Sequence, residues 1–138
     1  MPAAAKQDDT IYNQNETHIV MVPSASGQTP TPVPGHIFNA PISEDVSPDV
    51  NIEGKAAAVV GSGAKTNLAQ HPAMPPGVSY QPPGPSFEGR ITMGSRTVFI
   101  NGKPAARHGD PAITCNDPPT PPPGTGQVRV TRSTVNIG

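Results

Sequence analysis

Residues 96–110 read Arg96-Thr97-Val98-Phe99-Ile100-Asn101-Gly102-Lys103-Pro104-Ala105-Ala106-Arg107-His108-Gly109-Asp110. Val98 and Ile100 alternate with their neighbours, the period-two pattern of a strand with one buried face. Asn101-Gly102 follows at once, and this dipeptide tolerates positive φ at both central positions of a tight hairpin. Pro104 lies at the start of the return segment, where a missing N–H costs least. The stretch therefore predicts a small β-hairpin.

Parts of this hairpin recur twice. Residues 49–58 align with residues 97–106, and residues 134–138 begin a third copy. Upstream, residues 91–98 match residues 128–135 in their apolar positions and their turn. Each unit is too small to bury its apolar face alone, so the three units must pack together. The repeats predict a pseudo-threefold object.

Composition favours a folded β domain with few helices. The 138 residues fit one domain, and 20 Pro and 14 Gly approach the level typical of low-complexity chains. Disorder usually comes with high net charge, whereas the net charge here is −1. The apolar residues also fall in short alternating runs between turn residues. We expect a mainly β fold with Pro/Gly-rich loops, such as those at 72–89 and 118–126.

The chain divides into two parts on composition. Residues 1–16 are polar and Ala-rich, and they are expected to form a flexible N-terminal lead-in before a folded domain at 17–138. Residues 17–22 are a β-prone run ended by Pro23. Residues 24–35 carry three prolines and are expected to be extended and polyproline-like.

Several classes of function are disfavoured by the sequence. The chain has no Lys/Arg cluster, which argues against nucleic acid as a partner. No apolar run approaches the roughly 20 residues that span a bilayer, so stable membrane anchoring is not expected. The N-terminus lacks the basic start and apolar core of a signal peptide. A single cysteine, Cys115, rules out an internal disulfide.

Four histidines and the cysteine are candidate metal ligands: His18, His36, His71, His108 and Cys115. His and Cys are the usual ligands of tetrahedral zinc, but the spacing here fits no short template. Scattered surface histidines with one buried thiol remain an open alternative. His36 and His71 adjoin Pro/Gly bends, which favours a metal site. A small domain with few aromatic residues also needs extra stabilisation, and a bound metal can supply it. No nucleophile motif surrounds Cys115.

Residues 103–107, followed by Gly109-Asp110, resemble the PAAR-repeat proteins, whose name is the Pro-Ala-Ala-Arg run at 104–107. Residues 94–102 are similar to the usual lead into that run, and residues 134–138 are similar to its C-terminal echo. The resemblance covers residues 17–138. The first repeat departs from it, because residues 55–59 read Lys-Ala-Ala-Ala-Val without Pro or Arg.

The resemblance implies a small cone-shaped, pseudo-threefold β-hairpin repeat domain. Such a domain caps the trimeric spike of a contractile injection system, either a type VI secretion machine or a phage-tail-like particle. One monomer would sit by its broad base on a trimeric spike protein (VgrG-like or phage-like) and sharpen it for membrane piercing. It would be made in the bacterial cytoplasm, assembled at the particle tip and delivered outside the cell, with no enzymatic role. The apolar residues expected to fill the axis are Val50 and Ile52, Val98 and Ile100, and Val135 and Ile137.

The resemblance also implies a structural metal near the apex, usually zinc with iron possible, held by three His and one Cys. We assign His18, His36, His71 and Cys115 to it. His108 is set aside because it aligns with Val60, which suggests a strand position in the body of the cone. Two other functions stay open: an adaptor that carries a separate effector on the spike, and a small thiol- or metal-dependent enzyme.

Overall fold

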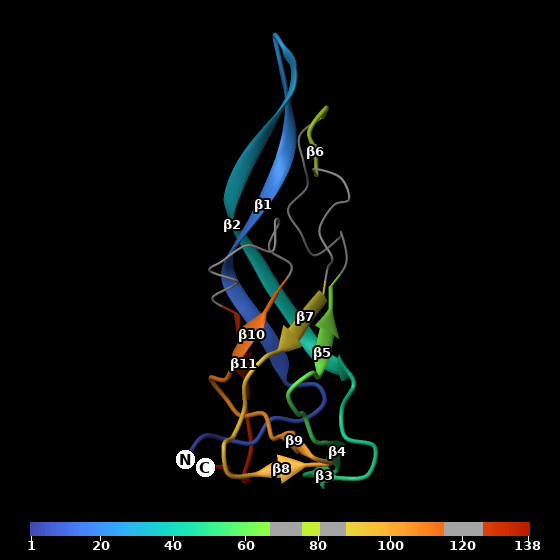
Figure 1. The fold of residues 1–138 in the computed structure, drawn as a ribbon, viewed down its shortest axis with the longest axis vertical. Helices are drawn as coiled ribbons and strands as arrows, with labels where there is room; N and C mark the ends of the chain where they lie inside the picture. Colours follow the sequence, from blue (N-terminus) through green and yellow to red (C-terminus); the bar gives the residue numbers. More distant parts are fainter. Residues whose placement is uncertain (67–75, 81–87, 115–125) are drawn as a thin grey trace.

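The computed structural model describes residues 1–66, 76–80, 88–114 and 126–138, and these ranges contain strands, turns and bends (Figure 1). The strands are β1 (Thr10–Ser24), β2 (Gly27–Glu44), β3 (Asn51–Ile52), β4 (Lys55–Ala56), β5 (Gly63–Lys65), β6 (Ser79–Tyr80), β7 (Glu88–Ile91), β8 (Phe99–Ile100), β9 (Lys103–Pro104), β10 (Pro111–Ile113) and β11 (Gly126–Arg129). Within the described ranges, no helix could cross a membrane.

Six strands close into a barrel. Their order is β11-β10-β7-β5-β2-β1, and β1 pairs back to β11. Three apolar pairs lie at matching places in the ladders: Ile42 with Ala64, Ile91 with Ala112, and Val128 with Ile11. All of these residues are at most 2% exposed. The predicted mainly β, pseudo-threefold fold is confirmed, since each repeat contributes one pair to a shared core.

Two short hairpins, β3–β4 and β8–β9, lie at the end of the molecule that also holds both chain termini (Figure 1). In β3–β4 the turn residues Glu53 and Gly54 have φ of 52° and 81°, and in β8–β9 Asn101 and Gly102 have φ of 53° and 79°. Positive φ at both central positions is what a two-residue hairpin turn requires. The hairpin predicted at Asn101-Gly102 is confirmed. We call the unit around β3–β4 repeat 1 and the unit around β8–β9 repeat 2.

Repeat 3 is built from both ends of the chain. Asn136 pairs with Ala3, just as Asn51 pairs with Ala56 and Phe99 with Pro104 in the other two repeats. The Ala4 N–H donates to the Val135 carbonyl at 2.8 Å, and the Ile137 N–H donates to the Pro2 carbonyl at 2.9 Å. The two chain ends therefore lie where the other repeats have their turns. We call the end formed by the two hairpins and these paired chain ends the base.

The three repeats are joined by closed rings of backbone hydrogen bonds. The Ala5 N–H donates to Ala106, Ala106 to Ala58, and Ala58 to Ala5, at 2.9, 3.0 and 3.0 Å. A second ring joins Gln7 to Ala56, Val60 to Pro104 and His108 to Ala3. The alanines of the first ring are fully buried. A small side chain is needed there because three backbones meet around one axis.

The expectation of a flexible lead-in at residues 1–16 differs from the structure. Ala4 and Ala5 are fully buried, and β1 begins at Thr10. This segment supplies the return half of repeat 3, whose first half ends the chain. The sequence hides this role because the segment pairs with residues more than a hundred positions away.

Beyond the barrel, β1 and β2 continue as a long hairpin toward which the molecule tapers (Figure 1). We call residues 18–33 the arm. The ladder runs from His18 opposite Val33 to Ser24 opposite Gly27, so the expected polyproline-like segment is a strand. Pairs that exchange hydrogen bonds alternate along such a ladder. Counting from the pair Ser24–Gly27 next to the turn, the prolines at 30, 32 and 34 occupy positions at which a backbone N–H would point away from β1. That side of residues 28–34 has no strand partner in the described structure.

Candidate functional site

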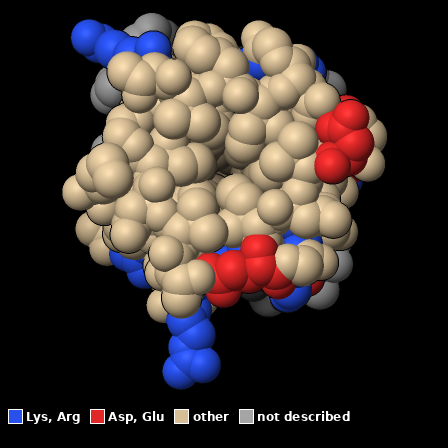
Figure 2. All heavy atoms as spheres, turned by 90° about the horizontal axis from the view of Figure 1, so that it is seen from below, with Lys and Arg blue, Asp and Glu red and all other residues tan. Residues whose placement is uncertain are grey.

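The base presents the same apolar residues three times. Matching positions of the three hairpins hold Val50, Val98 and Val135, and then Ile52, Ile100 and Ile137. The isoleucines are 6–9% exposed and belong to one buried cluster, whereas Val50 and Val135 are 38% and 39% exposed. Figure 2 shows this end with uncharged residues around a shallow central hollow and with the charged side chains toward the rim. The base is a weakly charged, threefold surface.

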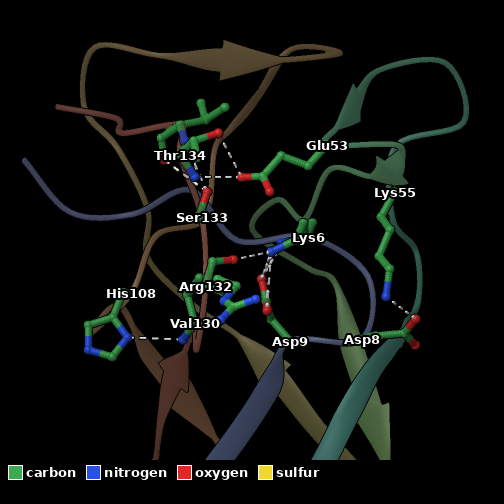
Figure 3. A network of polar contacts seen from close by, with 11 residues as sticks. Lys6, Asp8, Asp9, Glu53, Lys55, His108, Val130, Arg132, Ser133 and Thr134 are labelled. Carbon is green, nitrogen blue, oxygen red and sulfur yellow. Dashed lines mark hydrogen bonds and ion pairs between the residues drawn. The ribbon is translucent and has the colours of Figure 1, made fainter.

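The tips of repeats 1 and 2, and Gly138 in repeat 3, each contact the next repeat around the base. Glu53 at the tip of repeat 1 accepts hydrogen bonds from the backbone N–H of Thr134 at 2.6 Å and from its hydroxyl at 3.2 Å (Figure 3). Asn101 at the tip of repeat 2 donates to Asp49 at 2.8 Å, and the Gly138 carbonyl accepts from Thr97 at 3.2 Å. The Thr134 N–H holds the pKa of the Glu53 carboxyl below its usual value. These contacts therefore connect the three repeats to one another around the rim of the base.

The arginine of the Pro-Ala-Ala-Arg run closes a tight turn. Asp110 accepts from the Arg107 backbone N–H at 2.7 Å and from its guanidinium at 2.9 Å. This carboxylate raises the pKa of Arg107. Lys6 and Asp9 make the same turn in repeat 3, with the ammonium 3.2 Å from the carboxylate (Figure 3).

Repeat 1 makes this turn without charge. The Val59 N–H donates to the Ser62 hydroxyl at 3.0 Å, and that hydroxyl donates to the Asp45 carbonyl at 2.9 Å. In repeat 1, Val59 therefore takes the place of the arginine, and Ser62 takes the place of the aspartate with which that arginine pairs in repeat 2. The turn geometry is common to all three repeats and the charge is not.

His18 is the one predicted metal ligand whose side chain the structure describes. It lies on β1 where the arm leaves the barrel, and it is fully buried. Glu16 is also fully buried, and its Oε1 lies 3.7 Å from His18 Nε2. The Tyr80 ring packs edge-on against the imidazole, with centroids 5.5 Å apart. A buried imidazole beside a buried carboxylate is the kind of environment in which a metal ligand is held.

The other predicted ligands are only partly placed. The backbone of His36 lies on β2 directly opposite Glu16, while its side chain is outside the described part of the structure. His71 and Cys115 also lie outside the described residues. Thr114, which precedes Cys115, accepts a hydrogen bond from the buried Asn13 amide at 3.0 Å. Three of the four predicted ligands are therefore linked to residues 13–18 of β1. His18 is one of these residues, the His36 backbone lies opposite Glu16, and Cys115 follows Thr114 in the sequence.

The predicted ligand set is of the kind that tetrahedral zinc prefers, since imidazoles and a thiolate are its usual ligands. Across the residues the structure describes, no group of three or more His, Cys, Asp or Glu side chains could hold a metal ion. The four predicted ligands therefore remain a prediction from the sequence.

His108 has a different surrounding. Its Nδ1 accepts a hydrogen bond from the Val130 N–H at 3.0 Å near the base (Figure 3). Its alignment with Val60 is confirmed, since both backbone N–H groups make matching bonds in one ring. The expected strand position was wrong, because His108 lies in an exposed turn between β9 and β10.

Two features of the site were missed from the sequence. One is the pairing of residues 3–9 with the C-terminus, although Lys6 and Asp9 have the same i, i+3 spacing as Arg107 and Asp110. The other is Glu16, whose burial beside His18 left no signal in a polar stretch. The first could have been found by aligning the N-terminus with the repeat.

A family model of the PAAR motif matches residues 26–118 and again residues 83–138, so the matches together span residues 26–138. No curated protein and no solved structure matches the chain.

Proposed function

Because the chain belongs to the PAAR-motif family, we propose that it caps the trimeric spike of a contractile injection system as a structural tip without enzymatic activity. One observation supports this most strongly. The apolar residues of the base are identical in all three repeats, although most other positions differ. The isoleucines repeat because they fill a core that the three repeats share, whereas Val50 and Val135 remain 38% and 39% exposed. A trimeric partner would meet an equivalent valine in each repeat, so it accounts for the repetition at this exposed position.

The shape suits the same role. The base is the broad end, and the molecule tapers toward the arm at the opposite end (Figure 1). The chain would dock by its base as one monomer per trimer and direct the arm forward. We place its synthesis in the bacterial cytoplasm and its final position at the tip of a particle that leaves the cell.

The proposal includes a structural zinc ion held by His18, His36, His71 and Cys115. When bound, zinc would supply folding free energy by joining distant segments where the arm leaves the barrel. His18 would contribute a buried imidazole against which the Tyr80 ring packs edge-on. The buried surroundings of this ring would exclude water from the site.

Binding to a purified trimeric spike protein tests the docking surface. Val50→Asp places a carboxylate on the base at a half-exposed position, and Ile37→Asp, at 52% exposure on β2, is the matched control. Burying an unpaired charge and losing apolar contact should weaken Val50→Asp binding by more than about tenfold, with Ile37→Asp unchanged. Equal affinity of both variants, or three chains per spike trimer in light scattering, would contradict the proposal.

A second function, carriage of a separate effector, is favoured by one asymmetry. Phe99 is 57% exposed, whereas repeats 1 and 3 hold asparagine at that position. It lines a groove of about 410 Å³ with the residues Val60, Thr92, Met93, Gly94, Ser95, Arg96 and Pro104. This groove, lined by Phe99 of repeat 2, would suit one copy of an apolar protein segment. Phe99→Asn restores the threefold pattern, so it should abolish effector binding and leave spike binding intact.

A further inference from the structure

Each repeat has one open backbone position at the base. The valine carbonyls bond to the return segments: Val50 accepts from the Ala57 N–H at 2.9 Å, Val98 from Ala105 at 3.0 Å and Val135 from Ala4 at 2.8 Å. Bonding alternates along such a ladder, so the N–H and carbonyl of the next residue point away from the return segment. These next residues are Asn51, Phe99 and Asn136, and all three are exposed.

The strand pairing agrees with this assignment. Phe99 lies opposite Pro104, which has no N–H to exchange. In the described structure β3 and β8 each pair with one strand, so their other edges are open. In Figure 1, β8 lies below β9 and β3 lies below β4, which places the open edges at the outer end of the base. Asn136 is the equivalent position in repeat 3.

The neighbouring N–H groups are satisfied within the chain. Serine hydroxyls accept from the valine N–H groups: Ser47 from Val50 at 3.0 Å, Ser95 from Val98 at 2.9 Å and Ser133 from Val135 at 3.2 Å. On the other side, Ile52 and Ile100 lie in the pairs that close the two turns, and the Ile137 N–H donates to the Pro2 carbonyl. Within the described ranges, the base therefore presents one open backbone unit per repeat, in a threefold arrangement.

Two longer strand edges of the fold are closed or blocked. The barrel closes through the pairing of β1 with β11, and the outer edge of the arm has prolines at 30, 32 and 34. An open strand edge is a template for pairing with another chain. The base has the opposite character, because three equivalent edge positions surround an apolar centre and keep their donors.

Burial of the base makes these groups a requirement on the partner. Val50 and Asn51 are adjacent, so a partner that covers the half-exposed valine also removes the Asn51 N–H from water. A buried backbone group without a partner costs free energy comparable to a lost hydrogen bond. An extended segment supplies both a carbonyl and an N–H at the spacing of a strand, which side chains on a smooth apolar surface do not.

We propose that the base binds the spike by strand addition: each spike subunit contributes one extended segment, which exchanges main-chain hydrogen bonds with Asn51, Phe99 or Asn136. This proposal rests on the proposed function and adds the kind of partner, a trimer with an open strand edge in every subunit. It also explains the composition of the three outer strands. The flanking Val and Ile are repeated, whereas the position between them is Asn, Phe and Asn, because there the backbone makes the contact.

The test compares Asn51→Pro with Asn51→Ala, and Phe99→Pro with Phe99→Ala, in the full chain. Proline removes the outward N–H and leaves the hydrogen bonds within the hairpin, whereas alanine keeps the N–H. Affinity for a purified trimeric spike protein is measured by titration calorimetry. Each proline variant should bind at least about tenfold more weakly than its alanine counterpart. Gln28→Pro, at an outward position of the arm opposite Pro23, is the control and should bind as wild type does.

Amide hydrogen exchange of the wild type is a second measurement that needs no substitution. Exchange at Asn51, Phe99 and Asn136 should slow when the spike is bound, and exchange at Gln28 should not change. Proline variants that bind as tightly as their alanine counterparts, or unchanged exchange at all three positions, overturn strand addition. If the wild type binds the spike and Val50→Asp does not, those results leave the proposed function intact. A wild type that does not bind the spike overturns both.

Discussion

Replacing Asp9 by serine should destabilise the protein by about 3 kcal/mol, and replacing Lys6 by valine in the same chain should restore most of that loss. Asp9 and Lys6 are buried, with side chains 6% and 10% exposed. Repeat 1 makes the same turn with Val59 and Ser62, so the double variant copies a solution that already exists in the protein.

The expected loss of stability follows from the polar groups that each substitution leaves without a partner. Serine at position 9 can still accept the Lys6 backbone N–H, as Ser62 accepts the Val59 N–H at 3.0 Å. The Lys6 ammonium, however, loses its carboxylate and keeps only the Arg132 carbonyl at 2.8 Å. Breaking a buried pair on one side costs about 3–5 kcal/mol, and the remaining carbonyl places this case at the lower end.

The double variant Lys6→Val with Asp9→Ser removes both charges together. Replacement of a buried ion pair by apolar groups is often neutral, so the double variant should lie within about 1 kcal/mol of wild type. The Arg132 carbonyl loses its donor, but Arg132 is exposed and water can replace the ammonium. The two substitutions should therefore be strongly non-additive.

Urea unfolding with linear extrapolation measures these differences. For a chain of this size, a loss of 3 kcal/mol corresponds to a fall in Tm of about 10 °C. If Asp9→Ser unfolds within 1 kcal/mol of wild type, or if the double variant is as unstable as the single one, the reasoning from the pseudo-symmetry is refuted.

Two further results are expected. The pKa of Glu53 is lowered by the Thr134 N–H, so this contact stabilises the fold above the ordinary pKa and is lost as the pH falls through the lowered value. Glu53→Gln should flatten the fall of Tm between about pH 5 and pH 3, and an unchanged profile would argue against the contact. Threonine at positions 30, 32 and 34 would restore N–H groups along the outer edge of the arm, and such edges pair between molecules. Light scattering should then detect association, whereas a variant that stays monomeric would show that proline does not protect the edge.

Local features of the fold were predictable because their causes are local. Asn101 and Gly102 adopt positive φ, as this dipeptide predicted. The alternating pattern of residues 97–100 also predicted which face of β8 is buried, since Ile100 is buried and Phe99 is exposed. The repeats also followed from the sequence, since the same short pattern recurs at 49–58 and 97–106. The candidate ligand His18 was proposed from its residue type, and its complete burial was not predictable, because polar residues precede it and apolar residues follow it.

The tertiary structure decided everything that depends on distant pairing. The polar, Ala-rich residues at 3–9 carry little local signal for a repeat unit, and they complete repeat 3 by pairing with Asn136 and by joining the ring of alanines. Prolines at 30, 32 and 34 predicted an extended, polyproline-like segment, yet they are compatible with a strand whose partner lies on the other side. Glu16 and His18 acquire their shared buried surroundings where β6 packs against β1. Periodicity and turn chemistry act over a few residues, whereas burial and charge pairing are set by segments that only the closed fold brings together.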